Sequence, residues 1–160
     1  MTVVDGWTVD GYRGSPDAGG VTRNEGKFGV SFVIVDNPVK ACDGEAEPID
    51  PPLGPTVDDL ATYLARLPSL VISEESDVAL AGHRGEYFAY TKLAREIECG
   101  CCGMGTWPTN SQRDIDEYNE VWILDIDGIR LVIDAITTSG PSGTVMAELR
   151  QAVESIQIGP

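Results

Sequence analysis

The sequence has few basic residues: 11 lysines and arginines stand against 26 aspartates and glutamates, for a formal net charge of −15. These basic residues form neither a run nor a basic helix face, whereas binding to nucleic-acid phosphates requires clustered lysine and arginine. An anionic membrane surface would repel the chain for the same reason. We therefore expect no nucleic-acid partner. The acidity favours a cationic or neutral partner. Its alternative interpretation is that the negative charge only keeps the protein soluble.

Long apolar runs are missing as well. Apolar runs such as Leu131–Ile133 are far shorter than the roughly 20 residues that cross a bilayer, so we expect no transmembrane segment. No hydrophobic stretch of the secretory type follows the N-terminal residues Met1–Asp5. The 160 residues, 42% of them apolar, predict a single domain over residues 1–160 with a substantial core.

Histidine is nearly absent, since His83 stands alone. It lies in the predicted hairpin turn Gly82–Gly85, and no serine, cysteine or carboxylate partner is recognisable from spacing. A single histidine argues against a Ser-His-Asp triad and against multi-histidine metal sites. We interpret His83 as an exposed turn residue, and the chain as a non-enzyme that needs no cofactor.

Apolar alternation and turn residues outline the strands. We expect strands over residues 7–14, 28–35, 77–81, 86–93, 121–126 and 129–136. Residues 15–20 read as a turn region, and residues 36–55 and 98–119 as long connections. The clearest hairpin surrounds Asp127-Gly128, the preferred pair for a two-residue type I′ turn.

This turn fixes the register of the last hairpin. Trp122 then faces Ile133, and Asp125 faces Arg130 as a cross-strand ion pair worth about 0.2–1 kcal/mol. One face of the hairpin is predicted to be core: Trp122, Leu124, Ile126, Ile129, Leu131 and Ile133. The nearly continuous apolar character of residues 121–136 indicates that both faces are covered.

Two amphipathic helices are predicted. The first is capped by Thr56, with Asp59 in a capping box, and Pro68 ends it. The second extends from about Gly143 to Ser155 with an apolar stripe. Hairpins plus two separated helices predict an α+β fold, an antiparallel β-sheet flanked by two main α-helices.

The four cysteines are the most specific chemical feature. Cys42 lies in the first long connection, and Cys99, Cys101 and Cys102 lie in the second. Disulfides would tie the two connections together; Cys42–Cys101 with Cys99–Cys102 is the least strained two-bridge scheme, and a single bridge from Cys42 is the alternative. A metal–thiolate site of the same cysteines is a rival, although zinc sites normally present two separated ligand pairs. Free thiols are the third option.

Carboxylates offer three further interpretations. Asp125-Ile126-Asp127-Gly128 resembles the nucleophile motif of haloacid-dehalogenase phosphatases, but about 35 residues remain after it, too few for the rest of that domain. An enzyme that uses Asp125 or Asp134 needs both carboxylates exposed together in a cleft. Calcium binding by the acidic connections stays open, although an EF-hand register fails because it places Ile123 at the first ligand position.

Aromatic residues in predicted loops and edge segments form a candidate ligand cleft. They are Trp7, Tyr12, Trp107 and Tyr118. Packing residues would show the same pattern.

A family resemblance adds to these observations. The segments Asp50–Leu60, Val121–Gly128, Arg130–Ala135 and Val153–Ile156 resemble uncharacterised actinobacterial envelope domains, some of them lipoproteins, whose layout is similar to the PsbP-like α/β/α sandwich. The resemblance implies an extracytoplasmic location, with any signal or anchor outside this chain.

Two functions follow from the sequence. The first is a non-enzymatic extracytoplasmic binding or adaptor module, a monomer that binds an unknown protein or small molecule. The second is a small metal-handling or redox protein that uses Cys99, Cys101 and Cys102. The two differ in the expected state of the thiols.

Overall fold

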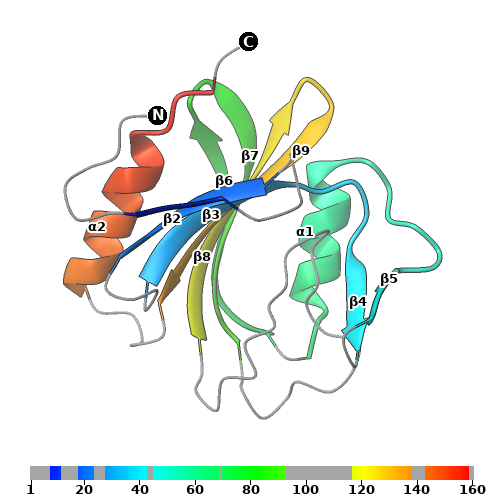
Figure 1. Cartoon of the computed structure of the whole chain (residues 1–160). Helices are drawn as coiled ribbons and strands as arrows, with labels where there is room; N and C mark the ends of the chain where they lie inside the picture. Colours follow the sequence, from blue (N-terminus) through cyan, green and yellow to red (C-terminus); the bar gives the residue numbers. More distant parts are fainter. Residues whose placement is uncertain are drawn as a thin grey trace.

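The computed structural model describes residues 8–11, 18–23, 28–42, 45–68, 70–92, 117–137 and 143–158. They form β1 (Thr8–Gly11), β2 (Ala18–Arg23), β3 (Phe28–Ile34), β4 (Val39–Cys42), β5 (Glu45–Pro48), α1 (Val57–Ala65), β6 (Leu70–Leu80), β7 (His83–Lys92), β8 (Glu117–Ile126), β9 (Ile129–Thr137) and α2 (Gly143–Glu154). The two helices lie on opposite faces of a sheet (Figure 1). The predicted α+β class and its layers are confirmed.

The sheet contains seven of these strands in the order β1-β2-β3-β9-β8-β7-β6, and each neighbouring pair is antiparallel. β8 and β9 lie in its interior and are buried on both faces, as their apolar sequences predict. β6 forms one edge and β1 the other. β4 and β5 pair separately as a small hairpin. Within the described residues, no helix is long and apolar enough to cross a membrane.

The β8–β9 hairpin has the predicted register and turn. Asp127 and Gly128 have φ values of 53° and 87°, and Asp125 is the Cα partner of Arg130. The predicted ion pair is nevertheless wrong. The Asp125 carboxylate accepts the N–H of Gly128 at 2.7 Å, while the Arg130 guanidinium donates to backbone carbonyls. Ile129, predicted to be core, is 48% exposed because it directly follows the turn.

The β6–β7 turn lies one position before the predicted one. Ala81 and Gly82 form it with φ values of 52° and 87°, and β7 begins at His83. His83 is thus the first residue of a strand and half-buried. Gly85 lies within β7 and not in the turn. Glycine is required there because a Cβ would lie 1.9 Å from the carbonyl oxygen of Ile123 on β8.

Helix α1 begins and ends as predicted. Thr56 Oγ1 accepts the Asp59 N–H at 3.2 Å, and Asp59 Oδ2 accepts the Thr56 N–H at 2.9 Å, which completes a capping box. Its last helical residue is Ala65, shortly before Pro68. The capping box holds the helix over one face of the sheet.

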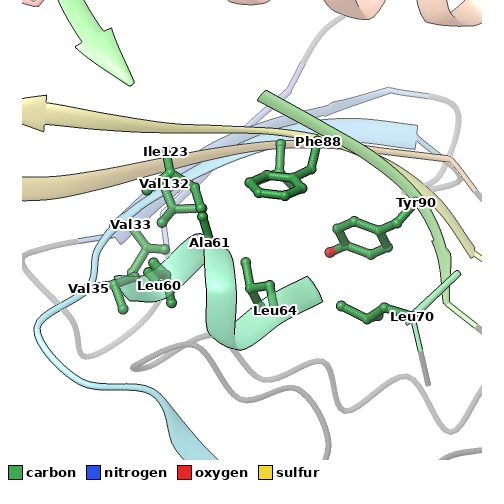
Figure 2. Close-up of a cluster of buried hydrophobic side chains, with 11 residues drawn as sticks. Val33, Val35, Leu60, Ala61, Leu64, Leu70, Phe88, Tyr90, Ile123 and Val132 are labelled. Atoms are coloured by element: carbon green, nitrogen blue, oxygen red, sulfur yellow. The ribbon is translucent and has the colours of Figure 1, made fainter. Parts of the chain in front are cut away.

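Each face of the sheet has its own core. The α1 side contains Val33, Val35, Leu60, Ala61, Leu64, Leu70, Phe88, Tyr90, Val121, Ile123 and Val132 (Figure 2). The α2 side contains Val30, Tyr87, Ala89, Trp122, Leu124, Ile133, Ala135, Met146, Leu149 and Val153. The predicted stripe of α2 is confirmed, since Met146, Leu149 and Val153 are its buried residues.

Four strands differ from the sequence prediction. β2 occupies part of the predicted turn region, β4 and β5 lie within the predicted connection 36–55, and β6 begins at Leu70 instead of Asp77. β2 includes two consecutive glycines, and β6 contains the acidic stretch Ser73–Asp77. Both compositions are unfavourable for strands, so pairing with neighbouring strands determines these segments.

Candidate functional site

Carboxylates gather on the α1 side of the sheet around the edge strand β6. Glu75 and Asp77 are exposed on β6, Asp58 is exposed on α1, and the half-buried Glu86 is the β7 partner of Asp77. Burial raises the pKa of Glu86, and the charges of Asp58, Glu75 and Asp77 raise it further. The charges that act on Glu86 are thus all acidic, although Arg84 lies only two residues before it. We call these four carboxylates the acidic surface.

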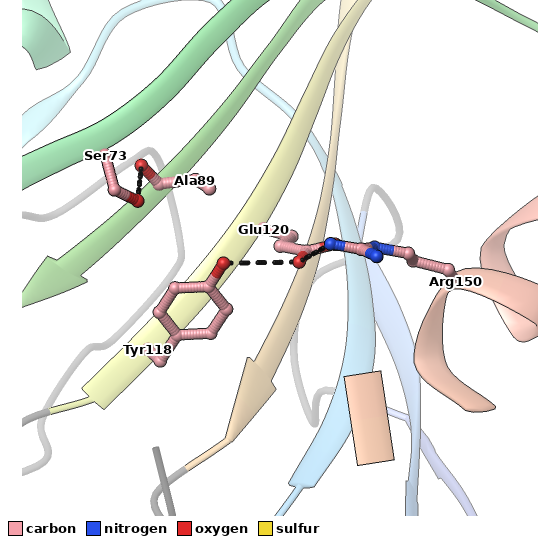
Figure 3. Close-up of polar contacts among 5 residues, drawn as sticks. All are labelled: Ser73, Ala89, Tyr118, Glu120 and Arg150. Carbon is pink, nitrogen blue, oxygen red and sulfur yellow. Dashed lines mark hydrogen bonds and ion pairs between the residues drawn. The ribbon is translucent and has the colours of Figure 1, made fainter. Parts of the chain in front are cut away.

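The strand that carries this surface is also the edge of the sheet. β6 comes last in the strand order of the described residues, and the five consecutive residues Ser73–Asp77 are exposed. Its pairing with β7 shifts register between Ile72 and Glu74, where the Ser73 hydroxyl donates to the Ala89 carbonyl at 3.0 Å (Figure 3). The bulge anchors β6 to β7, and in the described part of the chain no strand pairs with the other side of β6.

A second polar arrangement joins α2 to the sheet. Glu120 on β8 is fully buried, and Arg150 on α2 donates to it from Nε at 2.7 Å and from Nη2 at 2.6 Å (Figure 3). The Tyr118 hydroxyl donates to the same carboxylate at 3.3 Å. Burial, with the charge of Glu120, raises the pKa of Tyr87 to about 12. This bidentate pair holds α2 in place, because the buried Glu120 carboxylate would be costly without it, whereas the Arg150 side chain is half exposed.

A third group lies on the α1 side and consists of Lys92, Glu117, Asn119 and Asp134, with Tyr90 nearby. All five residues are buried. Asn119 Nδ2 donates to both carboxylate oxygens of Asp134, at 2.9 and 3.1 Å, and Lys92 Nζ lies 3.8 Å from Glu117 Oε2. Burial, together with the charge of Glu117, raises the pKa of Asp134 to about 7 despite the Asn119 amide. We call this group the buried polar cluster.

Arg130 ties the end of β3 to the start of α1. Its Nε donates to the Val35 carbonyl at 3.0 Å, and Nη1 donates to those of Gly54 and Thr56 at 2.8 and 3.2 Å. Nη2 donates to the Asp36 carbonyl. All the partners are backbone oxygens, so this side chain is structural.

The predicted site residues are distributed unevenly over the described structure. Tyr118 lies on β8 and contacts Glu120, whereas Trp7, Tyr12 and Trp107 fall outside the described residues. The predicted aromatic cleft therefore stays a prediction. Cys99, Cys101 and Cys102 also lie outside the described residues. Cys42 ends β4, and only its backbone is described.

The carboxylate interpretations can be judged more fully. Asp125 is exposed, whereas Asp134 is 1% exposed, so the exposed pair needed for an enzyme is missing. The segment Asp125–Gly128 is an antiparallel hairpin turn, unlike the phosphatase motif. Glu117, predicted in an acidic loop, is a buried strand residue. In the described part of the chain, no three His, Cys, Asp or Glu side chains form a potential metal site.

The sequence does not identify Glu120 and Arg150 as partners, and its predicted partner for Arg130 is wrong. Glu120 interrupts an apolar strand on its α2 face, and Arg150 lies on the predicted helix one residue after the buried Leu149. A charged residue at a core-facing strand position was the available signal. The helix that would supply its partner could not be known from spacing.

No protein-family model and no curated protein sequence matches the chain. Three solved structures are similar in shape. LpqN of Mycobacterium tuberculosis, involved in cell envelope biogenesis, has a TM-score of 0.53 at 14% identity over 100% of this chain and 82% of that one. A Pseudomonas aeruginosa protein of unknown function has a TM-score of 0.49 at 16% sequence identity, and the match covers 96% of this chain and 83% of that one. Cyanobacterial PsbP from Synechocystis has a TM-score of 0.43 at 14% sequence identity, and the match covers 94% of this chain and 80% of that one.

The similarity to LpqN shows a shared α+β fold and nothing more specific, because only 14% of the residues are identical. The other two similarities are weaker still and carry no argument. The resemblance to envelope domains is thus supported at the level of the fold. A bacterial lineage or lipid attachment for this chain stays a prediction.

Proposed function

We propose that the chain is a non-enzymatic, extracytoplasmic binding module that recognises a cationic partner through the acidic surface. One observation carries this proposal: Asp58, Glu75, Asp77 and Glu86 gather on one side of the sheet beside the edge strand β6. Burial raises the pKa of Glu86, and the charges of the other three carboxylates raise it further. Mutual repulsion of this kind destabilises the free protein. A cationic partner would relieve it, so binding gains from electrostatics that folding does not use.

The charged groups inside the molecule support a binding role rather than chemistry. Glu120 is held by Arg150, and Arg130 is held by four backbone carbonyls. These contacts fasten the two helices to the sheet and make the scaffold rigid. The extracytoplasmic location is proposed from the sequence resemblance, and from LpqN, an envelope-biogenesis protein of the same fold.

A charge-reversal experiment tests the proposal. A flexible hexalysine peptide is titrated into the protein by calorimetry at low and at physiological salt. We expect binding that weakens with salt and is lost in Asp77→Lys, but is retained in Glu154→Lys. Both residues are exposed, and Glu154 lies on α2, away from the acidic surface. Equal losses in the two variants would show that only net charge matters and would overturn the proposal.

The cysteine-based function stays the alternative. It predicts reduced, reactive thiols and stoichiometric metal in gently purified protein. Intact mass with thiol counting, combined with elemental analysis, separates the two functions. Two or four oxidised cysteines without metal support the binding module, because disulfides persist in oxidising compartments. Four free thiols with bound metal would make Cys42, Cys99, Cys101 and Cys102 the functional site.

A further inference from the structure

The edge strand β6 is long and open. It contains 11 residues, Leu70–Leu80, whereas globular strands typically have about 5–6. Any edge strand presents a row of backbone N–H and C=O groups with which a further strand can pair. In the described structure, β6 pairs with β7 on one side and with no strand on the other. Its geometry thus offers a place for one more strand.

The side chains of β6 define what such a strand must carry. Glu75 pairs with Phe88 of the α1-side core, so Glu75 and Asp77 face the α1 side. Glu74 pairs with Ala89 of the α2-side core and therefore faces the opposite side. Side chains alternate along a strand with a period of two. Lysine or arginine at alternate positions of an added strand would oppose both Glu75 and Asp77.

A second copy of this chain fits the edge poorly. Antiparallel pairing of two β6 strands centred on Ser76 would place Glu75 of each copy opposite Asp77 of the other. Like charges directly opposite each other destabilise a strand pair. Natural edge strands commonly use charge to prevent such self-association, and the same carboxylates complement a basic strand.

We propose that β6 accepts an extended, lysine- or arginine-rich peptide segment of a partner protein as an additional strand of the sheet. The backbone of β6 supplies hydrogen bonds, and Glu75 and Asp77 select the positive charge. This inference rests on the proposed function and specifies how the acidic surface binds. Glu86 and Asp58 would contribute to the attraction without direct pairing.

Two peptides of equal charge test the strand addition. One alternates lysine and valine over six residues, and the other has the same sequence with N-methyl groups on alternate backbone amides, which blocks pairing along one edge. We expect the first peptide to bind and to protect β6 amides in residues 73–79 from hydrogen exchange. The methylated peptide is expected to bind at least tenfold more weakly. Glu75→Lys should abolish binding of the first peptide, and Glu154→Lys should leave it within twofold.

The outcomes separate this inference from the proposed function. If both peptides bind equally well and Glu75→Lys weakens both, the acidic surface binds cations without strand pairing, which overturns the inference and leaves the proposed function standing. If neither peptide binds, both fall. If sedimentation shows a dimer of the free protein with protected β6 amides, the edge belongs to a second copy and the inference is wrong.

Discussion

Asp134 should make the stability of this protein depend on pH in an unusual direction. Its carboxylate is 1% exposed, and burial, together with the charge of Glu117, raises its pKa from 3.8 to about 7. Asn119 and the charge of Lys92 act in the opposite direction. Burial raises the pKa of the nearby Tyr90 hydroxyl, and the charges of Asp134 and Glu117 raise it further. Ionisation of Asp134 therefore destabilises the folded state.

The sign follows from proton linkage. Between pH 4 and 7 the folded state holds the Asp134 proton more tightly than the unfolded state, so stability falls as pH rises through this window. Above pH 7 both states are ionised and the deficit is constant. Each pKa unit corresponds to about 1.4 kcal/mol, so the deficit is on the order of 4 kcal/mol.

Asp134→Asn removes the ionisation and keeps the shape. The Asn119 amide can still donate to the new carbonyl oxygen, and Asn119 Oδ1, which has no hydrogen-bond partner among the described residues, can accept from the new amide. We expect the free energy of unfolding of the variant to exceed that of the wild type by about 2–4 kcal/mol at pH 8. At pH 4 this difference should disappear.

Urea unfolding of both proteins at intervals from pH 4 to 8 measures this difference. Asp125→Asn is the matched control, because Asp125 is exposed on the same hairpin. A constant difference between Asp134→Asn and wild type across this range would refute the reasoning. So would an advantage that grows toward low pH.

Three further predictions concern stability. Gly85→Ala should lower the free energy of unfolding by about 1–3 kcal/mol, because the added Cβ would overlap a carbonyl of β8. Gly143→Ala should not, because the space around its Cβ is open. Equal effects of the two substitutions in urea unfolding would contradict this. Arg150→Ala should lower the free energy of unfolding by about 3 kcal/mol, because it leaves the buried Glu120 carboxylate unpaired. Adding Glu120→Gln should recover part of that loss. An unchanged loss in the double variant would contradict this. Glu86→Gln should raise the melting temperature at pH 7 more than at pH 4, because a raised carboxyl pKa lowers stability as pH rises; scanning fluorimetry that shows equal shifts would contradict this.

Local chemistry made part of this fold predictable. The Asp127-Gly128 turn sets the register of β8 and β9 because two consecutive residues there adopt positive φ. The Thr56 and Asp59 capping box marks the start of α1 because both groups lie within one helical turn. In each case a short segment contains all the interacting atoms, so its sequence is sufficient.

Other features depend on residues far apart in the chain. Arg130 was assigned to the opposite Asp125, but it bonds to carbonyls of Val35, Gly54 and Thr56, some 74 to 95 positions away. Gly85 looked like a turn residue because its close approach to β8 is invisible in sequence. The same holds for the acidic surface, since the pairing of β6 with β7 and the placement of α1 bring its carboxylates together.

The contrast between inner and outer charges links structure to the proposed role. Buried Glu120 is neutralised by a bidentate arginine, as the low-dielectric interior requires. Around β6, by contrast, burial raises the pKa of Glu86 and its acidic neighbours raise it further, although water and salt weaken the repulsion there. A net charge of −15 spread evenly would serve solubility equally well. The four carboxylates Asp58, Glu75, Asp77 and Glu86 lie beside an edge strand, as a site for a basic, extended partner requires, and this placement makes β6 the first surface to test.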